Sequence, residues 1–248
     1  MKEKSSTLRG MFHIHSTYSH DGKISLSNLA TLCRENKYDF IITTEHAESI
    51  GNQQSMDKYL SECEKLSDSN FLIIPGLEFI CEREFHIIGV GVTDYITAND
   101  EKEVISEIHA QGSIAVLAHI GYYDHMDYEL FDEVDGIEFW NLKYDNKYLP
   151  RLKPLQMFEK FRKRNTEVLG FAGLDLHSEY YFGRLSINVE AKNLSINEIL
   201  SNLKKGNFYF TNRFITLYPT KIPGIHLKVI FRSFNLVYDM GKNIRDFL

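Results

Sequence analysis

The sequence contains little cysteine, and its cysteines are far apart in the chain. Cys33, Cys63 and Cys81 form no CxxC pair. An odd number of widely spaced cysteines is a poor basis for a disulfide framework. The chain is therefore not expected to be a disulfide-stabilised scaffold, and a reducing compartment is favoured.

Long hydrophobic runs are also absent. No stretch approaches the roughly 20 apolar residues that a membrane-spanning helix needs, and the first ten residues, MKEKSSTLRG, are polar with no hydrophobic region after them. No repeat, low-complexity tract or linker rich in proline and glycine divides the 248 residues. We therefore expect one cytoplasmic domain over residues 1–248, a size that single α/β barrels often have.

The chain has no excess of positive charge. It carries 28 Lys and Arg side chains against 34 Asp and Glu, a net charge of −6. Long nucleic acid is not an expected partner, because binding to a polyphosphate backbone needs a basic surface. A short oligonucleotide does not need an extended basic groove, and divalent cations can supply local positive charge that the side-chain count does not include.

Short apolar runs are separated by amphipathic segments, which is the pattern of strands and helices in an α/β fold. Pro219–Gly224 interrupts any period near the end of the chain, and we assign little to the last forty residues. The expected helices are Leu26–Asn36, Asn99–Gln111, Leu149–Asn165 and Ile196–Lys205. The expected strands are Met11–His15, Asp39–Thr44, Phe71–Phe79, Phe85–Val92, Ser113–Ile120, Gly136–Asn141 and Val168–Leu176.

Histidines and carboxylates occur at or near the ends of most of these strands. In α/β barrels the carboxyl ends of the strands face one side, where side chains from distant parts of the chain converge. We therefore expect one pocket that contains His13, His15, His46, Glu78, His86, His119, Asp175 and His177.

Two of these motifs have the spacing of metal ligands. In His13-x-His15, strand alternation is expected to place both imidazoles on one face, and Asp175-x-His177 repeats the geometry with one oxygen and one nitrogen. Imidazole and carboxylate ligands without thiolates suit zinc, manganese or iron, and they leave coordination positions open for water and substrate. The pattern is typical of a catalytic metal site.

Each residue alone has a plainer interpretation. A lone histidine at a strand end is more often hydrogen-bonded or at the surface than a metal ligand, and Glu78 alone fits a solvated loop. The combination is informative, because burial alone gives a sequence no reason to place an ionisable group near the end of almost every strand.

The motifs HIHSTYSHDG, TTEH, PGLEF, HIIGVG, AHI and GLDLH follow one another in this order. In this order they resemble the polymerase and histidinol phosphatase (PHP) family of metallohydrolases, over about residues 10–190. The resemblance implies a distorted, TIM-like barrel of seven strands and up to three divalent metal ions. Residues 191–248 are then expected to pack on the barrel.

The resemblance also implies how the ligands divide. One ion would be held by His13, His15, Glu78 and Asp175, and Glu78 would bridge to a second ion held by His86 and His119. A third would take His46, His177 and a ligand from the turn that contains His20 and Asp21. The residues leave open which of those two neighbours is the ligand.

The chain departs from the family at three places. Phe12 stands where the family commonly has Asp, Glu45 replaces the Asp of its TDH motif, and Ile120 replaces the Pro of its AHP motif. Every unambiguous ligand position nevertheless keeps a competent side chain, which predicts an intact site.

The predicted function is metal-dependent hydrolysis of a small phosphomonoester, such as a nucleotide or sugar phosphate, by a hydroxide that bridges two ions. Arg184 is a candidate for clamping the phosphate, with a surface ion pair as its alternative role. Aromatic and polar residues after the strands are candidates for the pocket wall, although packing explains them as well: Tyr122, Tyr123, Trp140 and Asn141.

Two other functions fit the same residues. An exonuclease or oligonucleotide phosphodiesterase would use the same metal chemistry. A regulatory module that binds metal without turnover would keep the same ligands. The catalytic candidates are Glu78, Asp175 and Arg184.

Overall fold

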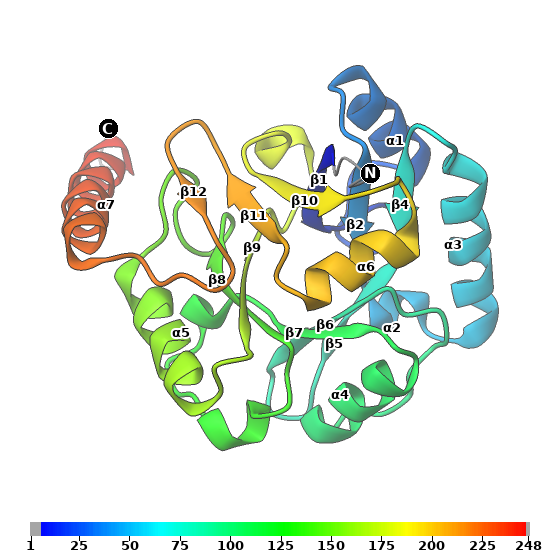
Figure 1. The fold of residues 1–248 in the computed structure, drawn as a ribbon, viewed down its shortest axis with the longest axis horizontal. Helices are drawn as coiled ribbons and strands as arrows, with labels where there is room; N and C mark the ends of the chain where they lie inside the picture. The colour runs from blue at the N-terminus through cyan, green and yellow to red at the C-terminus, as the bar shows by residue number, and fades with distance from the viewer. Residues whose placement is uncertain (1–5, 247–248) are drawn as a thin grey trace, which may run out of the picture.

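The computed structural model describes residues 6–246, whose strands and helices form an α/β fold (Figure 1). One six-stranded sheet has the order β12-β11-β10-β1-β2-β4. Its strands are β1 (Ser6–Ile14), β2 (Phe40–Thr43), β4 (Leu72–Ile74), β10 (Ser186–Ala191), β11 (Phe208–Thr211) and β12 (Thr216–Leu217). Strands β1, β2 and β4 are parallel, whereas β10 to β12 pair in antiparallel fashion.

The second six-stranded sheet has the order β3-β5-β6-β7-β8-β9. Strand β6 is antiparallel to both of its neighbours, and the other pairs are parallel. The strands are β3 (Glu45–His46), β5 (Gly76–Ile80), β6 (His86–Val90), β7 (Ile114–Leu117), β8 (Gly136–Asn141) and β9 (Leu169–Gly173).

Backbone hydrogen bonds connect the two sheets where the end of β1 meets the segment after β9. Leu174 N donates to Phe12 O over 3.1 Å, and His15 N donates to Leu176 O over 2.9 Å. The predicted α/β class is confirmed. The predicted barrel of seven strands is not, because the strands of residues 6–246 divide into two sheets that do not close into one ring.

The helices are α1 (Leu26–Glu35), α2 (Ala47–Ile50), α3 (Gln53–Leu66), α4 (Glu101–Ala110), α5 (Leu152–Arg164), α6 (Ile196–Lys204) and α7 (Ile225–Asp246). Figure 1 shows α3, α4 and α5 around the outside of the strands and α7 beside α5. Short 3-10 turns are η1 (Ile120–Tyr122), η2 (Tyr128–Phe131) and η3 (Glu179–Tyr181). Among residues 6–246 no helix has both the length and the apolar character that crossing a membrane requires.

Four of these helices correspond to predicted ones, whereas α3 was not expected. Helix α3 begins after Asn52, whose side chain accepts a hydrogen bond from Ser55 N. It buries Met56, Tyr59 and Cys63, which share one helical face at this spacing. The polar residues between them obscure the period in the sequence.

The predicted strand Phe71–Phe79 is in fact two strands in different sheets. Pro75 separates β4 from β5, and a proline cannot supply the backbone N–H that a continuous ladder needs. Leu72 to Ile74 pair with β2, whereas Leu77 and Glu78 pair with β3. The change of sheet at Pro75 places Glu78 on β5, between β3 and β6 of the second sheet.

Candidate metal centre

The His-x-His motif reaches the centre of the fold through an irregular strand. The pairing of β1 with β2 shifts register between Phe12 and Ile14, and His13 has φ of 65°. The rings of His13 and His15 still lie close together, with centroids 5.3 Å apart. A bulge at His13, rather than regular alternation, therefore turns both imidazoles toward the same place.

The histidines and carboxylates expected to share one pocket do lie together, and we call them the cluster: His13, His15, His46, Glu78, His86, His119, Asp175 and His177. Glu78 lies at its centre and is almost completely buried. Its oxygens lie 3.6 Å from His13 Nε2, 3.5 Å from His15 Nε2, 3.2 Å from His46 Nδ1, 3.1 Å from His86 Nδ1 and 3.2 Å from His119 Nε2. The Glu78 carboxylate thus lies close to five imidazoles. They come from β1, from the residue that follows β1, from β3, from β6 and from the segment after β7.

His86 joins this group from the beginning of a strand and not from its end. Because β6 runs antiparallel to β5 and β7, its first residue lies at the edge where its parallel neighbours finish. His86 thus lies at the same edge of the sheet as the other candidate ligands, because β6 runs in the opposite direction to its neighbours.

Asp175 and His177 complete the cluster from the segment after β9. Asp175 Oδ1 lies 3.9 Å from His13 Nε2, 3.7 Å from His15 Nε2 and 3.2 Å from His177 Nδ1. Like His13, both Asp175 and His119 have positive φ, at 49° and 29°. Left-handed backbone at non-glycine residues is strained, and its concentration here is typical of a functional site.

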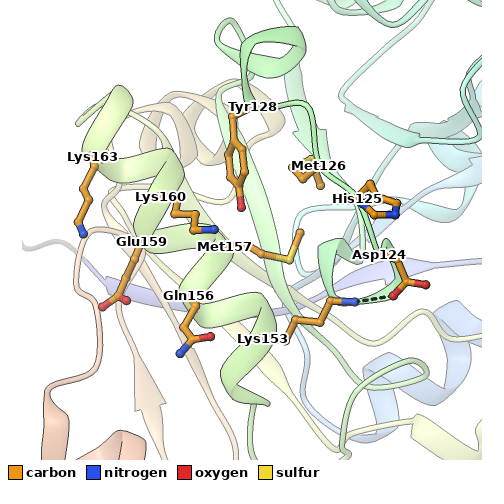
Figure 2. A pocket seen from close by; sticks show the side chains of 10 residues that line it. All are labelled: Asp124, His125, Met126, Tyr128, Lys153, Gln156, Met157, Glu159, Lys160 and Lys163. Atoms are coloured by element: carbon orange, nitrogen blue, oxygen red, sulfur yellow. Dashed lines mark hydrogen bonds and ion pairs between the residues drawn. The ribbon is translucent and has the colours of Figure 1, made fainter.

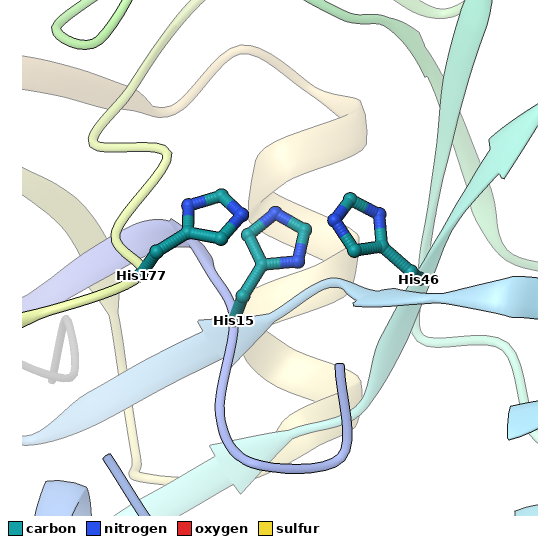
Figure 3. A group of neighbouring side chains, drawn as sticks. All are labelled: His15, His46 and His177. Carbon is teal, nitrogen blue, oxygen red and sulfur yellow. The ribbon is translucent and has the colours of Figure 1, made fainter. Parts of the chain in front are cut away.

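The turn with two candidate ligands places Asp21 and His20 differently. The Asp21 carboxylate bridges two rings, at 3.3 Å from His46 Nε2 and 3.0 Å from His177 Nε2. The His20 ring lies against His46, with centroids 5.1 Å apart, and its Nδ1 is 3.0 Å from Ser49 Oγ. Figure 3 shows His15, between His46 and His177, close to both rings, with centroids 4.3 Å and 4.2 Å apart.

The donor atoms form groups that fit metal ions. Within residues 6–246, sets of three have ligand atoms that all lie within 4.8 Å of one another: His13, His15 and Glu78; Glu78, His86 and His119; His15, His46 and His177; and His20, Asp21 and His46. Buried ring nitrogens without a hydrogen-bond partner occur in His13, His15, His46, His119 and His177. Such buried nitrogens are costly unless they bind something, and a cation satisfies them.

The pKa shifts in the cluster differ in direction from one side chain to another. Burial works to raise the pKa of Glu78, but the surrounding imidazoles, His13 foremost, outweigh it and hold that pKa well below its usual range. Burial lowers the pKa of His15 well below its usual value, which favours a neutral ring. Burial works to lower the pKa of His13 as well, but the carboxylates of Glu138, Asp175 and Glu78 outweigh it and raise that pKa well above its usual value. A metal ion binds the neutral form of an imidazole and the ionised form of a carboxylate.

Glu138 is a functional candidate that sequence reasoning missed. It is buried in β8, and its Oε1 accepts a hydrogen bond from His13 Nδ1 over 2.7 Å. Its Oε2 accepts from His119 N over 2.7 Å and from Asn141 Nδ2 over 2.9 Å. The bond to Nδ1 selects the tautomer of His13 whose Nε2 lone pair faces the cluster. The available signal was a single acidic residue in the otherwise uncharged strand GIEFWN.

Gly173 leaves room for this carboxylate. A Cβ at Gly173 would collide with Glu138 Oε1 and would lie 2.7 Å from His13 Cβ. The last residue of β9 therefore needs to be glycine for Glu138 to reach His13.

Glu45 supports the other side of the cluster. Its buried carboxylate accepts hydrogen bonds from Ser16 N over 2.9 Å and from Ser19 Oγ over 2.6 Å. Ser19 Oγ in turn accepts from His46 N over 2.9 Å and lies 3.2 Å from His15 Nδ1. Burial raises the pKa of Glu45. The residue that departs from the TDH motif thus orients the site without facing its centre.

Asn141 ties the turn after β8 to the cluster. Its Nδ2 donates to Glu138 and lies 3.3 Å from Asp175 Oδ2, while its Oδ1 accepts from Lys143 N over 3.0 Å and from Tyr144 N over 3.2 Å. Lys143 Nζ lies 3.5 Å from Asp175 Oδ1. This pair places a positive charge beside a carboxylate of the cluster.

Arg184, predicted to clamp phosphate, has other partners. Its Nε donates to Tyr180 O over 2.7 Å, and its guanidinium lies over the Tyr180 ring at 5.0 Å. It lines a hollow of about 220 Å³ together with Lys147, Asn212 and Arg213.

Two other candidates for the pocket wall are packed in the interior. Trp140 is fully buried and donates from Nε1 to Asn146 O over 2.7 Å. The Tyr123 hydroxyl accepts a hydrogen bond from His86 N over 2.8 Å. Packing, which was the plainer interpretation, thus accounts for Trp140. The Tyr123 hydroxyl instead positions the backbone of His86.

A separate hollow of about 510 Å³ lies between α5 and residues 124–128 (Figure 2). Lys153 pairs there with Asp124 at 3.2 Å, and Glu159 pairs with Lys228. Lys160 and Lys163 line it as well, but none of its lining residues belongs to the cluster.

Comparisons with known proteins found a match to a protein-family model. The family model for the PHP domain matches residues 12–209. No curated protein matches the chain significantly. The predicted class of enzyme, a metal-dependent phosphoesterase, agrees with this family.

Solved structures share the fold. A two-domain protein from Bacteroides vulgatus containing a predicted PHP-like metal-dependent phosphoesterase superposes with a TM-score of 0.61 at 21% identity, covering 86% of this chain and 66% of that one. A candidate metal-dependent phosphoesterase from Bifidobacterium adolescentis gives 0.52 at 14% identity, with 78% and 96% covered.

A third similar structure is the lesion-specific endonuclease PfuEndoQ from Pyrococcus furiosus, with a TM-score of 0.54, 12% identity and 82% and 56% of the two chains covered. This chain thus spans just under two thirds of the Bacteroides protein and little more than half of the endonuclease. The names of these structures differ in substrate, which leaves the substrate of this chain undetermined. The family model covers most of the chain and includes every clustered histidine and carboxylate, so the protein belongs to the PHP domain family.

Proposed function

We propose that this protein hydrolyses the phosphomonoester of a small molecule with two or three divalent metal ions, of the type zinc, manganese or iron. The observation that carries the proposal is that His13 Nε2 and His15 Nε2 are buried without a hydrogen bond, 3.6 Å and 3.5 Å from the Glu78 carboxylate. A protein that did not bind cations would gain nothing from keeping these atoms unsatisfied.

The proposed ligands combine the groups of donor atoms with Asp175, whose Oδ1 lies within 3.9 Å of both His13 Nε2 and His15 Nε2. His13, His15, Glu78 and Asp175 would hold one ion, and Glu78, His86 and His119 a second. His46 and His177 would hold a third with Asp21, which we prefer to His20 because its carboxylate lies within 3.3 Å of both rings whereas the His20 Nδ1 lies 3.0 Å from Ser49 Oγ.

Divalent ions in such a site supply Lewis-acid activation of the phosphoryl group and of a water molecule. The remaining work belongs to the chain. Glu138 and Glu45 hold the imidazoles in orientation, and Asn141 holds Asp175 and the turn after β8. The Lys143 ammonium, 3.5 Å from Asp175, is close enough to the cluster to neutralise charge on a phosphate, and we assign it the role first expected of Arg184.

Two other functions remain testable alternatives. The likeness in fold to an endonuclease allows a phosphodiesterase acting on short oligonucleotides, although the net charge of −6 does not favour long ones. A regulatory module would bind metal without turnover.

The test is a substrate panel with metal-free protein reloaded separately with zinc, manganese or iron. We expect release of p-nitrophenol from p-nitrophenyl phosphate and little from bis-p-nitrophenyl phosphate. His13→Ala and Asp175→Ala should each abolish the release. Faster cleavage of the diester would replace the monoesterase by the phosphodiesterase. Stoichiometric metal with no turnover of any ester would identify the regulatory module.

A further inference from the structure

Two exposed tyrosine rings lie together beside the metal cluster. Tyr122 belongs to η1, and Tyr144 belongs to the turn after β8. Their ring centroids are 5.0 Å apart at an interplanar angle of 57°. Tyr122 is 59% exposed and Tyr144 is 39% exposed.

Both rings also contact a residue of the cluster. The centroid of the His119 ring lies 4.8 Å from that of Tyr144 and 5.9 Å from that of Tyr122. The two exposed tyrosines therefore lie beside His119, a residue of the proposed metal site.

Hydrogen bonds fix the backbone of both tyrosines. Asn141 Oδ1 accepts hydrogen bonds from the backbone of Lys143 and Tyr144, and Asn141 Nδ2 bonds to Glu138. Tyr122 N donates to His119 O over 2.9 Å. The aromatic surface is thus connected to the same residues that orient the cluster.

The cation beside this surface adds a second requirement. Lys143 Nζ lies 5.4 Å from the centroid of the Tyr144 ring and 3.5 Å from Asp175 Oδ1. A ligand bound against these rings would meet flat π faces and a positive charge next to the cluster. An anionic group attached to a planar ring system matches both features.

We propose that Tyr122 and Tyr144 form a stacking surface for the base of a nucleotide, and that the enzyme selects nucleoside monophosphates over sugar phosphates. This inference rests on the proposed phosphomonoesterase function and narrows its substrate class. Ribose 5-phosphate and adenosine 5′-monophosphate present the same phosphate on the same sugar, so a preference between them reports on the base.

The experiment compares kcat/KM for these two substrates in the wild type and in tyrosine variants. Tyr144→Leu and Tyr122→Leu should each lower the ratio of the nucleotide value to the sugar phosphate value by about 5- to 150-fold, the range expected for loss of one base–aromatic stack. Tyr144→Phe keeps the ring and should retain the wild-type ratio. Tyr218→Leu is the matched control, because Tyr218 is similarly exposed, at 44%, and lies after β12.

A binding measurement separates this inference from the proposed function. Adenosine carries the base without a phosphate, and its contact with the protein can be followed by saturation-transfer NMR whether or not the protein turns over any ester. We expect a signal on the base protons that Tyr144→Leu weakens and that Tyr144→Phe and Tyr218→Leu keep. Absence of turnover with this signal intact would remove the phosphatase proposal alone. Equal losses for both substrates, or no adenosine signal, would overturn the stacking surface.

Discussion

At the scale of single residues, the side chains that face the cluster differ from those that orient it. The facing residues are ionisable groups whose types and spacing are visible in the sequence. The orienting residues act through single hydrogen bonds, such as the one from His13 Nδ1 to Glu138 over 2.7 Å. The carboxylate of Glu138 accepts hydrogen bonds from three donors, His13 Nδ1, His119 N and Asn141 Nδ2. An ionised carboxylate accepts all of them, whereas an amide offers only one oxygen.

Glu138→Gln therefore tests the orienting role at nearly constant volume. We expect metal affinity to fall about 10- to 100-fold, because the His13 ring loses the partner that holds its tautomer. A competition titration against a chromogenic chelator measures this without any substrate. Glu167→Gln, at an exposed position, provides the matched control. Wild-type affinity in Glu138→Gln would remove Glu138 from the site.

At the scale of elements, strand order and strand direction decide which residues meet. Pro75 divides one apolar run into β4 and β5, and the reversal of β6 brings His86 to the edge shared with its neighbours. Strand β9 contributes through its last residue, Gly173, whose missing side chain leaves room for Glu138 and His13. Because the interior is closely packed at this point, even one added methyl group should lower the stability of the fold.

Gly173→Ala should lower the free energy of unfolding by about 1–3 kcal/mol, the usual cost of overpacking a filled interior. Urea denaturation followed by circular dichroism measures the change. Gly224→Ala is the control, because a Cβ at Gly224 meets no atom within 4 Å, and it should change stability by less than about 0.5 kcal/mol. If the Gly173→Ala protein were as stable as the Gly224→Ala protein, Glu138 would not need the space that Gly173 leaves open.

At the scale of the whole molecule, the candidate ligands come from both sheets. His13 belongs to β1 of one sheet, whereas Glu78 and His86 belong to β5 and β6 of the other. The sheets are joined by backbone hydrogen bonds between the end of β1 and the segment after β9. An ion held by residues of both sheets would therefore cross-link the fold, and a ligand that binds only the native state stabilises it.

Metal should accordingly raise the melting temperature. At a free concentration of about 100 times Kd, we expect a gain of about 2.7 kcal/mol, or roughly 5–10 °C for a chain of this size. Differential scanning fluorimetry with zinc or manganese, and again after a chelator, measures the shift. His13→Ala and Asp175→Ala should show much smaller shifts. An identical shift in these variants would mean that the metal stabilises the protein from another position.

The sequence by itself determined the class of fold, the types of ligand and the edge of the sheets at which they collect, because hydrophobic periodicity and motif spacing are local properties of the chain. Only the tertiary structure decided which residues support those ligands. Glu138 and His13 are 125 positions apart, and no local pattern relates them. The same holds for Lys143, which contacts Asp175, and for Tyr122 and Tyr144, which become neighbours only when η1 and the turn after β8 pack together. Contacts of this kind depend on how strands pair and turn, and strand pairing is settled by the packing of the whole chain.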